Sequence, residues 1–177
     1  MEVSTEEEIN QIEVGKPHVV ILGAGASYAA FPNGDKNGRK LPLMNNFVET
    51  LGIEELITRT GLSFSSKNFE NIYTEIHRKP ELSDIREELE NVVYEYFQSM
   101  TLPDEPTIYD HLVLSLRQKD FIATFNWDPF LVQAIRRNGT RFKTPRTLFL
   151  HGNVEVGYCK DGHMMGNNGE HCHHCGE

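Results

Sequence analysis

The 177-residue chain has few cysteines, no long apolar run and no block of basic residues. Its three cysteines all follow residue 158 and form no disulfide framework, so we expect a reducing, cytoplasmic compartment. No run of about 18 apolar residues is present, and the acidic start of the chain lacks the apolar stretch of a secretory signal, so no membrane span is expected. The net charge of −9 argues against binding nucleic acid through its phosphates.

What the sequence does contain is an alternation of short apolar runs and helical patterns. The runs at 18–22, 121–125 and 147–152 predict strands, and the first is typical of a strand buried on both faces. Helices are predicted at 84–100 and 107–117, both with a capping-box pattern at the start, and from Pro129 onwards. Looser helical patterns precede Gly61 and Pro80. The alternation predicts the α/β class, with a Rossmann-like, mainly parallel sheet and flanking helices.

Three regions are expected along the chain. Residues 1–16 form a mobile acidic segment, residues 17–156 form the ligand-binding α/β domain, and residues 157–177 form a small zinc-binding module. The chain stops two residues after Cys175, within the metal motif, which suggests a fragment of a longer protein.

Each predicted strand is followed directly by glycine or polar residues of the kind found in binding sites. The first leads into the glycine loop 23–27, the second into Asn126, Trp127 and Asp128, and the third into His151 followed by glycine. Ligands of parallel sheets bind outside the carboxyl ends of the strands. If the three strands are neighbours, these groups meet at one crevice.

The glycine loop, GAGAS, follows a strand and opens a helix, a setting in which backbone N–H groups can approach a phosphate closely. Tyr28 stands where the dehydrogenase fingerprint requires a third glycine, so that reading fails. The alternative is a plain tight turn between strand and helix. The candidate phosphate-binding residues are Gly23, Ala24, Gly25, Ala26 and Ser27.

The candidate catalytic residues are Asn126, Asp128 and His151. Asp128 precedes Pro129 and is expected to cap the next helix, but capping does not explain Asn126. A carboxamide at a strand end can orient a water or hold a sugar hydroxyl. An imidazole titrates near neutral pH and can act as a base, although a lone histidine after a strand is more often structural.

The C-terminal Cys/His cluster has the composition of a zinc site. Three thiolates and one imidazole make a tetrahedral set, and we take Cys159, Cys172, Cys175 and His163 as its ligands. Two alternatives remain: a His-rich tail that binds metal only adventitiously, and a fourth ligand beyond residue 177.

The ordered set GAGAS, NWD, HG and Cys/His tail resembles the Sir2 (sirtuin) family, over residues 18 to 175. The spacing is most similar to divergent bacterial SIR2-like proteins, many of which consume NAD+ in antiphage defence. The resemblance implies that the glycine loop cradles the pyrophosphate of NAD+ and that Asn126 positions water or ribose. It further implies that Asp128 holds ribose hydroxyls or orients its loop, and that His151 is the general base.

The implied function is an NAD+ glycohydrolase that yields nicotinamide and ADP-ribose, with NAD+ as substrate and zinc as a structural metal. Sirtuin deacylases carry an Asp-Phe-Arg motif after the glycine loop, and this chain reads YAAFPNGDKNGR there. A lysine deacylase is therefore the first alternative, and a non-catalytic NAD+ or ADP-ribose sensor the second. For a toxic activity of this kind we expect gating by homo-oligomerisation or by a partner domain.

Overall fold

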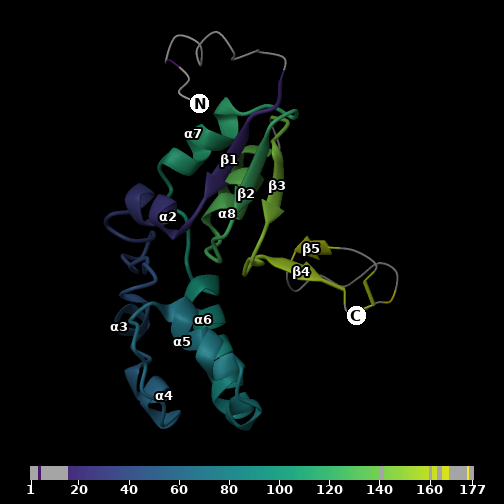
Figure 1. Cartoon of the computed structure of the whole chain (residues 1–177). Helices are drawn as coiled ribbons and strands as arrows, with labels where there is room; N and C mark the ends of the chain where they lie inside the picture. Colours follow the sequence, from purple (N-terminus) through teal and green to yellow (C-terminus); the bar gives the residue numbers. More distant parts are fainter. Residues whose placement is uncertain are drawn as a thin grey trace.

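The computed structural model describes residue 4 and residues 16–139, 142–159, 161, 162, 165–167 and 175 (Figure 1). Three strands of a central sheet alternate with helices, and a second, two-stranded sheet follows. The elements are β1 (Val19–Leu22), α2 (Ala24–Ala30), α3 (Phe47–Leu51), α4 (Glu54–Arg59), α5 (Phe69–His77), the 3-10 helix η1 (Pro80–Leu82), α6 (Ser83–Gln98), α7 (Ile108–Ser115), β2 (Phe121–Thr124), α8 (Phe130–Gly139), β3 (Arg146–Phe149), β4 (Val156–Tyr158) and β5 (Met165–Asn167).

The central sheet is parallel, with the order β1-β2-β3, which confirms the α/β class. Val19 lies opposite Phe121, which in turn lies opposite Arg146 on β3. Because the strands are parallel and in register, their carboxyl ends lie side by side. The three polar segments that follow them are thereby brought to one edge.

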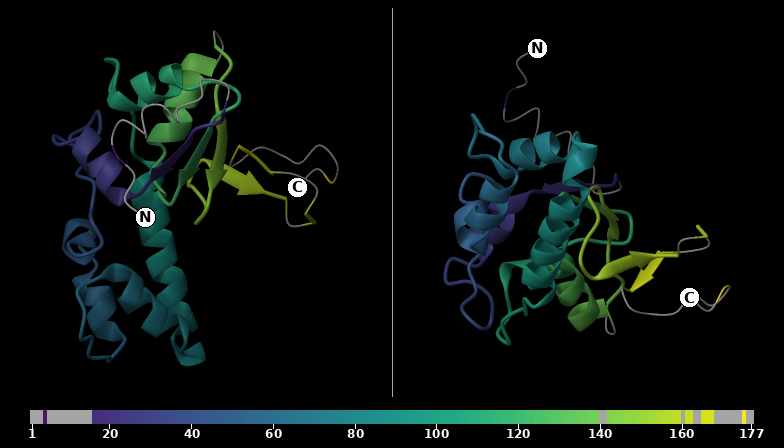
Figure 2. Two further views of the ribbon diagram at one scale, coloured as in Figure 1. Left: turned by 45° about the horizontal axis from the view of Figure 1, so that its top comes forward. Right: turned by 90° about the horizontal axis from the view of Figure 1, so that it is seen from below.

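The two faces of this sheet differ sharply in exposure. Leu22 and Ile122 point to one face, are 8% and 0% exposed, and belong to a core that includes side chains from α7 and α8. The two green helices lie beside the sheet in the views of Figure 2. On the other face Val19 is 63%, Ile21 69% and Leu148 52% exposed. The prediction that the first strand is buried on both faces is therefore wrong. Its apolar run is continuous, but in the part of the chain that the structure describes helices pack against one face alone.

The predicted helices form, with different details at their starts. In α7 the capping box of Thr107 and Asp110 is confirmed. In α6 the predicted box at Asp84 is wrong, because η1 runs directly into the helix and Leu82 occupies the N-cap without a side-chain bond. Ile108, an apolar residue of α7, is 64% exposed. It is the first helical residue, where the chain has not yet reached the core.

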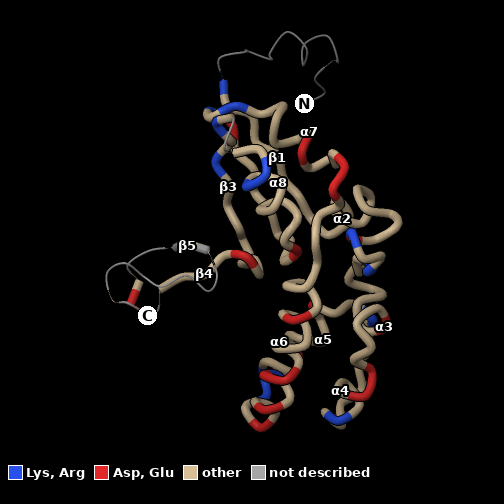
Figure 3. The backbone as a smooth tube through the Cα atoms, turned by 180° about the vertical axis from the view of Figure 1, so that it is seen from behind, with Lys and Arg blue, Asp and Glu red and all other residues tan. Residues whose placement is uncertain are grey.

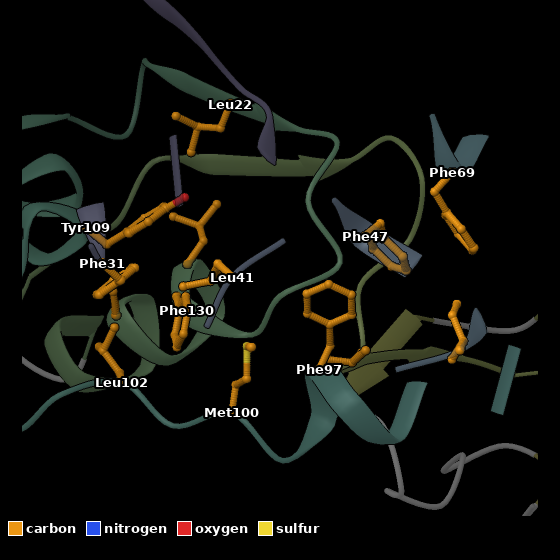
Figure 4. Packing of buried hydrophobic residues seen from close by; sticks show 14 of the residues in the cluster. Leu22, Phe31, Leu41, Phe47, Phe69, Phe97, Met100, Leu102, Tyr109 and Phe130 are labelled. Carbon is orange, nitrogen blue, oxygen red and sulfur yellow. The ribbon is translucent and has the colours of Figure 1, made fainter. Parts of the chain in front are cut away.

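The helices α3, α5 and α6 enclose an aromatic core beside the carboxyl edge of the sheet. Phe47 and Phe69 are stacked with ring centroids 4.1 Å apart, and Trp127 meets both rings edge-on at 5.9 and 6.3 Å. Figure 4 shows Phe47 and Phe97 apart from a second group, in which Phe31 and Tyr109 lie near Phe130. Trp127 thus anchors the segment after β2 to the helical part of the molecule.

Two buried carboxylates away from this edge have structural partners. Asp110 accepts hydrogen bonds from Arg137 and Asn138, which tie α7 to α8. Burial alone would raise the pKa of Asp110, but these bonds and those from Thr107 lower it overall. Asp120 accepts from the backbone N–H of His18 at 2.8 Å, and this bond leads the lowering of its pKa. Both ionised groups stabilise the fold rather than compose a site.

The pair β4-β5 is antiparallel and leads away from the central sheet. Lys and Arg gather around the amino-terminal ends of β1 and β3, while Asp and Glu predominate on the lower helices (Figure 3). Among the described residues, no helix has the length and apolar character needed to cross a bilayer.

Candidate functional site

The three strand ends line one cavity of about 220 Å³. Gly23 and Ala24 come from the glycine loop, Asn126 and Asp128 from the segment after β2, and His151 from the segment after β3. The remaining wall is largely apolar. It consists of Leu41, Pro42, Met44, Phe47, Glu70, Phe97, Phe125 and Trp127, together with Ser27. The predicted convergence of the three motifs is present, whereas Gly25 and Ala26 do not line this cavity.

The hydroxyl of Ser27 is hydrogen-bonded to three other polar side chains at the cavity wall. Its hydroxyl is 1% exposed and donates to Oδ2 of Asp128 at 2.7 Å. Since the serine proton is used in that bond, the phenol of Tyr109 donates to Ser27 Oγ at 2.6 Å, and Nδ2 of Asn126 donates to the same oxygen at 2.9 Å. The serine hydroxyl therefore holds the other site residues in place and is not turned towards a phosphate.

Asn126 has one half of its carboxamide satisfied and the other half open. Nδ2 is held by Ser27, while the buried Oδ1 has no hydrogen-bond partner among the described residues. The side chain is 7% exposed. An unpaired buried acceptor costs about 1–3 kcal/mol, and such exceptions in a native structure call for a reason. A ligand that donates an N–H or O–H into the cavity provides that reason.

Asp128 combines helix capping with a perturbed carboxyl group. Its Oδ1 accepts from the backbone N–H of Phe130 at 3.3 Å, as expected for a residue that caps α8. Burial raises the pKa of Asp128 to about 6, and the hydrogen bonds from Ser27 and Phe130 offset only part of that rise. The group therefore changes charge just below neutral pH. Burial likewise raises the pKa of Tyr109, with the neighbouring Asp128 adding to the effect, so the phenol keeps its proton.

The segment after β3 places His151 at the mouth of the cavity. The imidazole is exposed, and its ring meets the ring of Phe125 edge-on with centroids 5.0 Å apart. Gly152 has φ +79, a left-handed conformation that favours glycine. Asn153 Nδ2 donates to the backbone carbonyl oxygens of Asp128 at 2.7 Å and of Asn126 at 3.3 Å. These two hydrogen bonds hold the segment after β3 against the segment after β2.

The glycine loop forms the start of α2, with Gly23 at the N-cap in an extended conformation. A Cβ atom at Gly23 or Gly25 would meet nothing within 4 Å, so both glycines border open space. The first N–H groups of a helix have no partner within the helix. The loop can therefore be approached by a ligand from outside, beside the cavity.

Two residues of this arrangement were missed from the sequence. Tyr109 lies within α7, and no motif surrounds it in the sequence. Asn153 directly follows the His-Gly pair, and a carboxamide at that place was the available signal.

The cysteine cluster is present in part. Cys159, Asp161 and Cys175 place their ligand atoms within 4.8 Å of one another, and this group could hold a metal ion. The two sulfur atoms are 3.4 Å apart, which is too far for a disulfide and near the roughly 3.8 Å expected for two thiolates on one tetrahedral zinc. Asp161 was not predicted as a ligand. The predicted ligands His163 and Cys172 lie outside the described residues.

No protein-family model matches this chain, and no curated protein sequence matches it either.

Proposed function

We propose that the chain is an NAD+ glycohydrolase that cleaves the bond between nicotinamide and ribose. The observation that carries the proposal is the buried Oδ1 of Asn126, which has no hydrogen-bond partner in the described part of the chain and lies in the wall of a cavity that Asp128 and His151 also line. The nicotinamide riboside end of NAD+ offers both an amide N–H and ribose O–H groups to such an acceptor.

The size of the cavity supports the binding of one end of the dinucleotide. Its 220 Å³ is below the roughly 300–1,000 Å³ that encloses a whole drug-sized ligand. The remainder, with the pyrophosphate, would lie along the open side of Gly23 and Gly25. We therefore include in the proposal that the sheet binds the dinucleotide in the manner of a Rossmann-like domain, at the carboxyl ends of its strands.

The reaction needs little covalent help from the protein. Nicotinamide leaves as a neutral molecule with the electron pair of the broken bond, and positive charge develops on the ribose ring. Above pH 6 the Asp128 carboxylate is ionised and lies near the place where that charge develops, and a fixed buried charge acts strongly there. His151 would accept the proton of the attacking water, a role that contributes about 10²- to 10⁴-fold.

The fixed geometry of the polar groups favours this use. Ser27 binds both Asn126 and Asp128, and Asn153 holds the backbone between them. Groups that are already oriented do not have to reorganise as the transition state forms.

The test is NAD+ consumption by the purified chain, with products separated by chromatography. We expect nicotinamide and ADP-ribose in equal amounts. His151→Ala should lower kcat by about 10²- to 10⁴-fold and leave the affinity for NAD+ nearly unchanged. Asn126→Ala should lower both kcat and the affinity for NAD+. His111→Ala, at an exposed histidine on α7, is the matched control.

A wild-type rate in His151→Ala would remove the proposed base. Turnover only with an acylated peptide, with release of O-acyl-ADP-ribose, would assign a deacylase instead. If the chain turns nothing over alone, calorimetric titration with NAD+ distinguishes an enzyme gated by a partner or a second copy from a domain that binds no NAD+. Tight binding without turnover under any activating condition would assign a sensor.

A further inference from the structure

A second cavity, of about 490 Å³, lies next to the first. Both side chains line this cavity and the first one. The walls come from α5, α6 and the segment after β3. They consist of Phe69, Tyr73, Leu89, Glu90, Val93, Tyr94, Asn153 and Val154. The size is within the range of small-molecule sites, and the role proposed above for the first cavity does not use it.

Aromatic rings dominate one wall of the second cavity. Tyr73 and Phe69 have centroids 6.1 Å apart, and Phe69 meets Trp127 at 6.3 Å in an edge-on arrangement. Tyr94 adds a fourth ring. Four aromatic rings therefore border one space. Aromatic rings attract quaternary ammonium groups through their negative faces.

The charge at the rim has the matching sign. Among the described residues that line the second cavity, Glu90 is the one carboxylate and there is no lysine or arginine. Tyr73 donates a 2.5 Å hydrogen bond to Glu90. Arg86 is not part of the lining and forms an ion pair with the same carboxylate at 3.7 Å. The helix that carries Glu90 has five acidic residues and one arginine, so its field attracts cations.

We propose that the second cavity binds a compact organic ammonium ion, with the cationic head over the rings of Tyr73 and Trp127 and its charge balanced by Glu90. The aromatic wall supplies the cation–π attraction and the carboxylate supplies the sign preference. Because Trp127 and His151 line both cavities, an occupant of the second cavity would contact two side chains that also border the first. The binding itself does not depend on the reaction proposed for the first cavity.

The experiment uses Trp127 as its own probe, because it is the one tryptophan of the chain. Choline is titrated against the chain with tryptophan fluorescence as the signal, beside 3,3-dimethylbutan-1-ol, a neutral molecule of the same shape. We expect a saturable change with choline and an affinity about tenfold weaker for the neutral molecule.

Two variants locate the site. Glu90→Gln should weaken choline binding several-fold and leave the binding of the neutral molecule unaffected. Glu88→Gln should change neither, because Glu88 lies on α6 beside Glu90 but is paired with Arg59 of α4. Val93→Phe fills the second cavity alone and should abolish the response. Equal binding of the two molecules, no saturable response to choline, or an unchanged affinity in Glu90→Gln would each overturn the proposal. If Val93→Phe does not fold, the exposed Glu90 position still decides the outcome.

Discussion

The hydroxyl of Ser27 donates a 2.7 Å hydrogen bond to the buried carboxylate of Asp128, 101 residues further along the chain. This bond joins the glycine loop after β1 to the polar segment after β2. Asn126 and Tyr109 meet at the same serine oxygen, so one small hydroxyl fixes three other polar side chains.

Replacing Ser27 by alanine should destabilise the protein. The change removes the donor to a buried carboxylate and the acceptor of two further bonds, and a loss of this kind costs about 1–3 kcal/mol. Denaturant unfolding measures it, with Ser83→Ala, at an exposed serine, as the control. Equal stability of Ser27→Ala and wild type would mean that water replaces the hydroxyl. NAD+ turnover should fall with the loss of order at Asn126.

The charge of Asp128 should make stability depend on pH in an unusual direction. The pKa is raised from 3.8 to about 6 in the folded state, so the folded chain holds this proton more firmly than the unfolded chain. The stabilisation by the protonated form is complete below pH 3.8 and is lost as the pH rises through about 6. The full effect is about 3 kcal/mol.

The difference between wild type and Asp128→Asn isolates this group, because every other carboxyl is common to both proteins. The free energy of unfolding of wild type relative to the variant should fall between pH 4 and pH 6.5. A pH-independent difference would show that Asp128 has an ordinary pKa in the folded state.

The cysteine cluster should bind zinc near one equivalent per chain, measured by elemental analysis after dialysis. Cys175→Ser should lose the metal, and chelators should lower the Tm of wild type but not of this variant. Asp161→Asn should weaken the affinity, while Asp104→Asn, at an exposed aspartate paired with Lys36, serves as the control. A metal-free protein with an unchanged melting curve would refute the zinc assignment.

Gly152→Ala should displace the proposed base, His151, while leaving its side chain intact. A Cβ atom at φ +79 costs about 1–2 kcal/mol, and the strain falls on the residue next to His151. We expect lower stability by this amount and a kcat below that of the control, Gly139→Ala, where a Cβ meets one methyl group at an ordinary 3.7 Å. Equal kcat in both variants would show that the position of His151 does not depend on this turn.

The features that could be predicted from the sequence are those that depend on residues close together in the chain. Strand positions, the capping box at Thr107 and the meeting of three strand ends at one edge follow from short-range patterns and from the geometry of parallel sheets. The exposure of Val19 does not, because it depends on which elements cover the sheet and not on the residues of the strand. The hydrogen bond from Tyr109 to Ser27 was equally out of reach, since it joins a motif to a residue without one, 82 positions away.

The pairing of β1 with β2 has a consequence for synthesis of the chain. Val19 finds its partner Phe121 only after 102 further residues have been made, and a parallel strand cannot close onto a nearby hairpin partner in the meantime. At about 5–20 residues per second, the ribosome leaves this apolar strand without its neighbour for about 5–20 s. Valine and isoleucine in such a waiting strand are a target for chaperones and for mispairing with other nascent chains. The acidic residues that precede it, Glu6, Glu7, Glu8 and Glu13, are placed where charge repulsion between chains opposes that mispairing.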